Sequence, residues 1–297
     1  MREFTAEPLD IPSVTVAESP QWHEDALWYC DIEAGGLLRF DPQDASLKRW
    51  TLDGALASIA PTDGGFIAGT SLGFEYLSLE DDRLKRELLH APFTASPTAP
   101  MPGTRMNDGI ADPSGRFWCG SMEPNSPQLG RLFCLDKGQI RAVRDGFRTL
   151  NGLAFSSDGR RLYVSDSHPS VAKVWTIALD ADGMPVEKPQ LFANLSEFTN
   201  LSKVGGRPDG ATVDEDGGYW IAASDSGRVL RLDPKGRPDM VIHVPTTNPT
   251  NITFGGRDFR TAFITSLKPG GKGNEFAGRI FAVDLPVAGR KPDRYIA

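Results

Sequence analysis

The chain has 297 residues, of which 39% are hydrophobic and 24% are charged, with 31 glycines and 23 prolines. This composition is typical of a globular protein rich in turns and excludes a disordered chain. The formal net charge of -7 argues against a nucleic-acid partner, because proteins that bind nucleic acid usually present a basic face.

The first residues, MREFTAEPLDIPSV, lack the continuous apolar core of a signal peptide, and the chain contains no run of about 18 apolar residues. We therefore expect a cytoplasmic protein with no membrane partner.

Cys30, Cys119 and Cys134 form no CxxC pair. The sequence predicts that they are reduced and buried rather than disulfide-bonded or bound to zinc.

A short apolar segment recurs six times along the chain. The copies are, in chain order, LWYCDI (27–32), GFIAGT (65–70), RFWCGSM (116–122), RLYVSDS (161–167), GYWIAAS (218–224) and TAFITSL (261–267). A second apolar run that ends near an acidic turn follows each copy, so we expect six β-hairpins. Turns rich in Asp and Gly precede several of these hairpins, as in DPSG (112–115) and SSDG (156–159).

Another strand leads into each hairpin. These incoming strands are ESPQW (18–22), ASIAP (57–61), NDGIAD (107–112), NGLAFS (151–156), PDGATVD (208–214) and TNITF (250–254). With an outer edge strand, each unit has about four strands, and the spacing of roughly 50 residues is typical of propeller repeats. The sequence therefore predicts an all-β fold, a six-bladed β-propeller with four-stranded blades, as a single domain over residues 1–297.

Residues 79–91, LEDDRLKRELLHA, have the pattern of an amphipathic helix. They nevertheless occupy the place at which every other copy has an outward-turning strand, so a strand is the favoured prediction.

A propeller places the first strand of every blade around one axis, so equivalent residues in different copies converge on one channel. Aligning the incoming strands puts Glu18, Asp108, Asn151 and Asp209 in one column. Carboxylate and amide oxygens are the ligands that hard divalent cations prefer. Asn151 and Asp209 each precede a glycine and would by themselves indicate turns, but their equivalent placement with Glu18 favours a metal site.

Arg105 and Asn107 are two residues apart, so in an extended segment their side chains point to the same side. We expect both to face the mouth of the channel, where they can hydrogen-bond the oxygens of a polyol-like ligand. The alternative is a surface arginine in a loop rich in glycine and proline.

Four motifs occur in the order ESPQW, RMNDGIADPSGRFWCGSM, LNGLAFSSDGRRLYVSDS and GRPDGATVDEDGGYWIA. They resemble those of the SMP-30/gluconolactonase/regucalcin-like family, and the resemblance runs from about Glu18 to the last blade. It implies a six-bladed propeller that hydrolyses sugar lactones with a divalent cation.

Carried over by position, the resemblance implies that Glu18, Asn151 and Asp209 bind the metal and that Asp209 is also the catalytic acid and base. It implies that Arg105 and Asn107 contact the substrate. A further substrate-contacting Glu of some members corresponds to Asn125, with Glu123 two residues earlier. Which of these two residues contacts substrate stays open, and so does the sugar.

The implied function is metal-dependent hydrolysis of an aldonolactone, such as a glucono-, xylono-, arabinono- or galactonolactone, to the open-chain acid. The cofactor is one divalent cation, with calcium, zinc, manganese, magnesium and iron(II) all compatible with the donors. The alternatives are a non-catalytic metal-binding propeller and a promiscuous esterase or organophosphate hydrolase of related fold. The expected partner is a small sugar lactone, and the protein is expected to be a monomer or weak oligomer.

Overall fold

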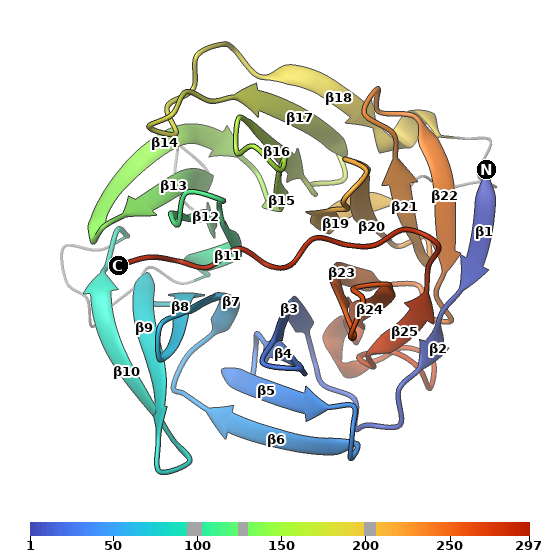
Figure 1. Ribbon diagram of the computed structural model, residues 1–297, viewed down its shortest axis with the longest axis horizontal. Coiled ribbons are helices and arrows are strands. Elements are labelled where there is room, and N and C mark those ends of the chain that lie inside the picture. Colours follow the sequence, from blue (N-terminus) through green and yellow to red (C-terminus); the bar gives the residue numbers. More distant parts are fainter. Residues whose placement is uncertain (94–102, 124–129, 199–205) are drawn as a thin grey trace.

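The computed structural model describes residues 1–93, 103–123, 130–198 and 206–297, and it is an all-β structure. Six sheets are arranged around a central axis like the blades of a propeller (Figure 1), and the region along this axis is called the channel. In each sheet four strands run antiparallel from the channel outward, and the blades are numbered here in chain order. The predicted six-bladed β-propeller is confirmed.

The strands follow the repeats found in the sequence. Blades 1 to 3 are β3 (Ala17–His23), β4 (Ala26–Asp31), β5 (Gly36–Asp41) and β6 (Ser46–Thr51); β7 (Leu56–Thr62), β8 (Gly65–Thr70), β9 (Phe74–Glu80) and β10 (Arg83–His90); and β11 (Arg105–Ala111), β12 (Phe117–Met122), β13 (Gly130–Asp136) and β14 (Gln139–Phe147). Blades 4 to 6 are β15 (Leu150–Phe155), β16 (Arg161–Asp166), β17 (Lys173–Ala178) and β18 (Gln190–Asn194); β19 (Arg207–Val213), β20 (Tyr219–Ser224), β21 (Arg228–Leu232) and β22 (Pro238–His243); and β23 (Pro249–Gly255), β24 (Thr261–Ser266) and β25 (Phe281–Asp284).

The N-terminal strands β1 (Arg2–Thr5) and β2 (Glu7–Pro8) close the ring of blades. β2 pairs antiparallel with β25 and so supplies the fourth strand of blade 6. β1 pairs in parallel with β22 and adds a fifth strand to blade 5, as seen at the right of Figure 1. The outer strand of blade 6 therefore comes from the start of the chain and not from its own repeat.

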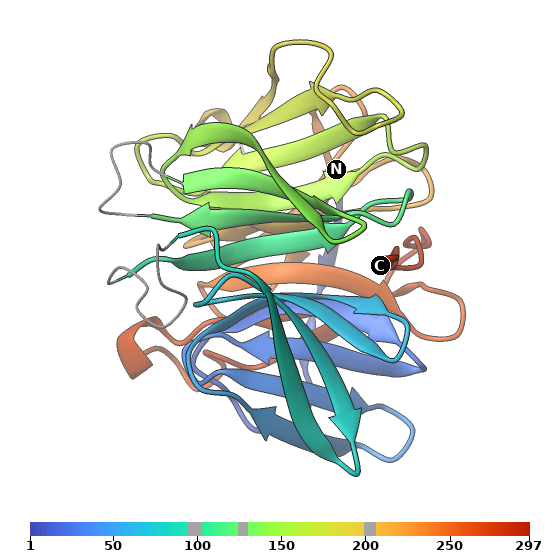
Figure 2. The same cartoon turned by 90° about the vertical axis from the view of Figure 1, so that its left-hand side faces the viewer.

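The C-terminal segment after β25 leaves blade 6 and crosses the channel at one end (Figures 1 and 2). The backbone amides of Leu285 and Gly289 donate to the Arg260 and Phe259 carbonyls of blade 6. Those of Tyr295 and Ile296 donate to the Pro61 carbonyl of blade 2 and the Gly115 carbonyl of blade 3. We call residues 286–297 the strap. The end of the channel that it crosses is the far end, and the opposite end, where the inner strands begin, is the mouth.

Apolar side chains are buried mainly between neighbouring blades. In the described part of the chain the buried residues form six clusters, each at the junction of two blades. At the junction of blades 6 and 1, for example, the Trp22 and Phe263 rings stack with their centroids 5.3 Å apart. Cys30, Cys119 and Cys134 are free and buried, as the sequence predicts.

Residues 79–91 form strand and turn rather than helix. β9 and β10 pair directly, and the turn between them consists of Asp81 and Asp82, whose φ angles are 49° and 59°. Two successive positive φ angles are the geometry of the two-residue turn that matches the twist of a hairpin.

The helical elements in the described residues are the short 3-10 turns η1 (Leu195–Glu197) and η3 (Pro269–Gly271), and none has the length and apolar character to cross a membrane.

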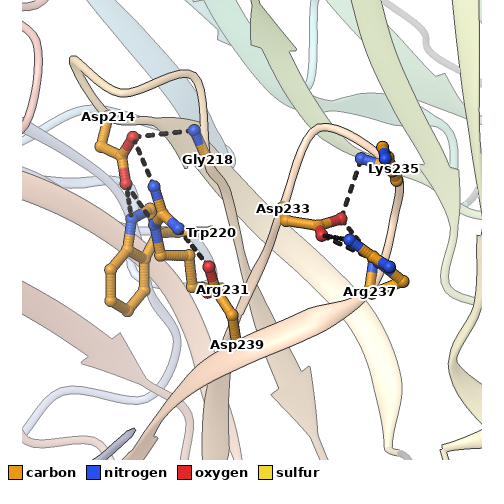
Figure 3. Close-up of polar contacts among 8 residues, drawn as sticks. All are labelled: Asp214, Gly218, Trp220, Arg231, Asp233, Lys235, Arg237 and Asp239. Atoms are coloured by element: carbon orange, nitrogen blue, oxygen red, sulfur yellow. Dashed lines mark hydrogen bonds and ion pairs between the residues drawn. The ribbon is translucent and has the colours of Figure 1, made fainter. Parts of the chain in front are cut away.

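A buried aspartate in the turn before the second strand joins that strand to the rest of its blade. In blade 5, Asp214 accepts hydrogen bonds from Trp220 Nε1 at 2.7 Å and Arg231 Nε at 2.6 Å, as Figure 3 shows. In blade 3, Asp112 accepts from Trp118 Nε1 at 2.9 Å in the same way. The recurring spacing of Asp and Trp in DPSGRFW and DEDGGYW is therefore a structural feature.

Replacing the buried Arg231 with methionine should destabilise the fold much more than the same change at Arg237. The Arg231 side chain is 7% exposed and its partner Asp214 is fully buried, so Arg231→Met leaves a carboxylate without its counter-charge. We expect a loss of about 3 kcal/mol in the free energy of unfolding. Arg237, whose side chain is 69% exposed, pairs with Asp233 in the same blade (Figure 3). Urea unfolding of both variants tests this, and equal midpoints would contradict it.

Candidate functional site at the channel mouth

The inner strands of the blades change register at a common level near the mouth. In β3, β11, β15 and β19, two residues of the inner strand lie opposite one residue of the second strand. Such β-bulges bend a strand and change the direction of its side chains. Of the predicted site residues, Glu18, Asn107, Asn151 and Asp209 lie at or beside these bulges.

The bulges are of two kinds, and this corrects the predicted column of four equivalent residues. Ser19 and Gly152, the first bulge residues of β3 and β15, have positive φ angles of 49° and 65°, and the site residues Glu18 and Asn151 come just before them. In β11 and β19 the first bulge residue lacks this conformation. In these two strands the site residues Asn107 and Asp209 are themselves the first bulge residues.

Asp108 is not equivalent to Asp209, because it lies one residue farther along its strand. Its Oδ2 atom accepts a hydrogen bond from the Leu153 amide at 2.8 Å. Asp108 also lines a cavity of about 50 Å³ inside the channel, together with Arg290 and Asp293 of the strap. It therefore faces the far end of the channel, below the other predicted residues.

A chain of hydrogen bonds joins the mouth residues of blades 3, 4 and 5. Arg105 Nη1 donates to Asn107 Oδ1 at 2.6 Å, and Asn107 Nδ2 donates to Asn151 Oδ1 at 2.8 Å. Asn151 Nδ2 donates to Ser167 Oγ at 2.6 Å, and this hydroxyl donates to the Pro208 carbonyl at 2.5 Å. Asn151 Oδ1 keeps a second lone pair for another partner, since an amide oxygen accepts two bonds.

Glu18 is held in place from blade 6. Its Oε2 atom accepts from the Ser19 amide at 2.6 Å and from Asn251 Nδ2 at 2.8 Å. Oε1 receives no hydrogen bond from the described residues. Burial and, next, the charge of Asp108 raise the pKa of Glu18 to about 7.

The Asp209 carboxylate is close enough to Glu18 for the charge of Glu18 to affect its pKa. Its side chain is surrounded mostly by protein but keeps some exposure at the mouth. Burial raises the pKa of Asp209 well above its usual range, the charge of Glu18 raises it further, and the charge of Arg207 lowers it. Among the described residues, no hydrogen bond to the Asp209 carboxylate contributes to this shift.

This donor set fits a divalent cation. Two partly unsatisfied carboxylates repel each other in a buried place, and a bound cation would remove that repulsion. The described residues contain no group of three or more His, Cys, Asp or Glu side chains arranged for a metal. The amide oxygen of Asn151 is a donor of another type that hard cations accept.

Arg105 has hydrogen-bonding capacity left for a ligand. Its Nη1 donates to the Met106 carbonyl at 2.8 Å as well as to Asn107. Its Nε and Nη2 make no hydrogen bond to the described residues. Burial lowers the pKa of Arg105, and the charges of Glu18 and Asp209 oppose that effect.

Asn125 lies outside the described residues. Glu123 is buried, and both of its carboxylate oxygens are engaged by Arg131, from Nε at 2.8 Å and from Nη2 at 2.9 Å. Ser121 Oγ donates a further bond to Glu123 at 2.6 Å. In this structure Glu123 is therefore occupied by protein partners.

Several polar residues at the mouth escaped the sequence analysis. Asn251 was seen only as part of the strand TNITF, and Ser167 only as part of the hairpin segment RLYVSDS. Arg207 and Asp225 form an ion pair, with Arg207 Nε and Asp225 Oδ2 at 2.5 Å. A repeated Ser-Asp-Ser after the second strand, at 165–167 and 224–226, was the available signal for Ser167 and Asp225.

Comparison with known proteins agrees with this architecture. A 6-deoxy-6-sulfogluconolactonase of Pseudomonas putida is 39% identical over 288 residues, which cover 94% of each chain. The pentonolactonase XacC of Haloferax volcanii is 31% identical over 291 residues, again 94% of each chain. Among solved structures, the calcium-binding protein regucalcin of Agrobacterium tumefaciens superposes with a TM-score of 0.87 at 23% identity, covering 100% of this chain and 99% of that chain.

The family model described as the SMP-30/Gluconolactonase/LRE-like region matches residues 16–268. This match spans all six inner strands, from Glu18 in β3 to β23 and the following strand β24. The chain therefore belongs to the SMP-30/gluconolactonase/LRE-like family.

Proposed function

We propose that this protein is a metal-dependent lactonase that opens the ring of an aldonolactone at the channel mouth. The observation that carries the proposal is that the half-buried Asp209 carboxylate lies close enough to the buried Glu18 carboxylate and to Arg105 for their charges to interact, near the bulge that Asn151 precedes. Two relatives that match nearly the whole chain are named as lactonases of sugar acids, which supports the same reaction class. The propeller would act as one domain, since the donors come from different blades.

In this proposal Glu18, Asn151 and Asp209 hold one divalent cation. Calcium is the first ion to test, because a structural neighbour is named as a calcium-binding protein and because the donors are all oxygens. Magnesium, manganese, zinc and iron(II) remain candidates on the same chemistry. When bound, the cation would polarise the lactone carbonyl and make a water molecule more acidic.

Asp209 is suited to move the protons of the reaction. A carboxylate whose pKa is raised by burial is a better proton acceptor near neutral pH than an ordinary aspartate. It would take a proton from the attacking water and later return it to the ring oxygen as the carbon–oxygen ester bond breaks. The products are the free carboxylic acid and a hydroxyl group, so all atoms of lactone and water are accounted for.

Arg105 and Asn107 are suited to orient the sugar. The Nε and Nη2 groups of Arg105, which make no hydrogen bond to the described residues, can donate to hydroxyl and ring oxygens, and the hydrogen bond to Asn107 fixes the guanidinium. The mouth is thus polar, as expected for a sugar lactone rather than an apolar ester.

Asp209→Asn should abolish most metal-dependent turnover. We expect kcat on glucono-δ-lactone to fall by about 100-fold or more, because general acid–base catalysis contributes about 10²–10⁴-fold. Acid release measured on metal-stripped protein, with single cations restored, provides the assay and also tests metal dependence. Asp258→Asn, at an exposed ion pair with Arg260, is the control. Unchanged metal-dependent turnover in Asp209→Asn would assign the proton transfers to another group.

Asn251→Ala should weaken cation binding without removing a metal ligand. The Asn251 amide holds the Glu18 carboxylate, and loss of such an outer partner typically costs about 10–100-fold in metal affinity. Calorimetric titration with Ca²⁺ measures the change, and the control Asn274→Ala, in an exposed loop, should bind as the parent does. Equal affinity of Asn251→Ala and the parent would mean that Glu18 needs no support from blade 6 or does not bind the ion.

A further inference from the structure

A second arginine occupies the position in blade 5 that Arg105 occupies in blade 3. Arg105 pairs with Met122 and Arg207 pairs with Ser224. In each inner strand one more regular pair follows the arginine before the bulge begins. Each arginine stands two residues before a site residue, Asn107 or Asp209. Since alternate side chains of a strand point to the same side, Arg207 lies on the face of β19 that carries Asp209.

Arg207 differs from Arg105 in having a carboxylate partner. Its Nε and Nη2 atoms donate to the two oxygens of Asp225 at 2.5 and 3.2 Å, in the two-pronged arrangement of arginine with a carboxylate. Asp225 lies in the turn between β20 and β21. The side chains of Arg207 and Asp225 are 34% and 45% exposed, so both can reach a ligand.

Polar groups of the segment that leads into blade 6 hold this pair in place. Asn248, which is 7% exposed, donates from Nδ2 to Asp225 Oδ1 at 2.8 Å. Thr247 Oγ1 in turn donates to Asn248 Oδ1 at 2.7 Å. An exposed ion pair usually contributes little to stability, yet here two blades supply residues that orient it.

The pair is also close to the proposed reaction centre. Arg207 and Asp225 both act on Asp209, the arginine lowering its pKa and the aspartate raising it. Two residues of extended strand span roughly 7 Å. If the carbonyl group of a ligand lies beside Asp209, the part of the ligand most distant from that carbonyl can therefore extend toward Arg207.

We propose that Arg207 and Asp225 form a distal subsite that binds the neutral exocyclic hydroxyl group of a hexonolactone. A hydroxyl group both donates and accepts, and the pair offers a carboxylate acceptor next to Nη1 of the arginine, a donor that makes no hydrogen bond to the described residues. The two charges cancel, and Asp225 repels an anionic substituent. The inference rests on the proposed lactonase function and specifies the substrate class within it.

Two lactones that differ only in the exocyclic group provide the test. Xylono-δ-lactone has the ring of glucono-δ-lactone without its hydroxymethyl group. We expect Arg207→Met to lower kcat/KM for glucono-δ-lactone by about tenfold or more, since a hydrogen bond to a charged group contributes about 1.5–3 kcal/mol. The value for xylono-δ-lactone should change by less than about twofold, because that substrate has no group to bind there.

Asp225→Asn provides a second variant at the subsite and should show the same substrate-selective loss. This substitution leaves the side chain of residue 225 beside Asn248 and removes the charge of its acceptor group. Arg237→Met, which removes an exposed arginine–aspartate pair of the same blade at the far end, is the matched control and should leave both values unchanged. Urea unfolding of each variant shows whether the ring of blades is intact.

Three results would overturn the subsite. One is an equal loss on both lactones, which would mean that Arg207 acts through Asp209 or the scaffold. Another is no loss on either lactone. The third is a higher kcat/KM for a hexonolactone with an anionic group at its terminal carbon than for glucono-δ-lactone. Parent protein that hydrolyses no lactone with any of the cations would instead refute the lactonase function itself, so the two failures are distinguishable.

Discussion

The closure of the ring between blades 6 and 1 is the constraint on which the site depends. The ring closes because β2 completes blade 6 and because Trp22 of blade 1 stacks on Phe263 of blade 6. Across the same junction Asn251 donates to the Glu18 carboxylate. If blade 6 did not pack against blade 1, Glu18 would lose the hydrogen bond from Asn251. The Glu18 carboxylate would then no longer be held near that of Asp209.

The site is arranged at a cost to the fold. Burial and the charge of Asp108 raise the pKa of Glu18, and burial and the charge of Glu18 raise that of Asp209, so their ionised forms are unfavourable in the absence of a cation. Ser19 has a φ of 49°, a conformation that residues other than glycine seldom adopt. The Ile59 amide of blade 2 donates to Ser19 Oγ at 2.9 Å and helps to hold that conformation. Neighbouring blades thus stabilise an unfavourable local geometry at the mouth, as is common at functional sites.

The repeats allowed the blades to be predicted, because each copy carries the same hairpin pattern and turn residues. Glu18, Asn151 and Asp209 could be selected since all belong to inner strands. The column that included Asp108 was wrong in register, because Asp209 is the first residue of its bulge and Asp108 is the second residue of its own, and spacing does not reveal the residue at which a bulge begins. Arg207, Asp225 and Asn248 meet only through the packing of two blades, and the strap has no periodic pattern. These features required the three-dimensional arrangement.

The pairing of the first strands with the last ones has a consequence for how the protein is made. β1 and β2 are synthesised before the blades, but their partners β22 and β25 follow much later in the chain, since Arg2 pairs with Met240 and Pro8 with Phe281. Until then these strands, and the facing edges of blades 5 and 6, present unpaired backbone groups of the kind that invite association with other chains. Nascent chains should therefore be most vulnerable to aggregation late in translation, and final closure should be a slow step that joins distant parts of the sequence.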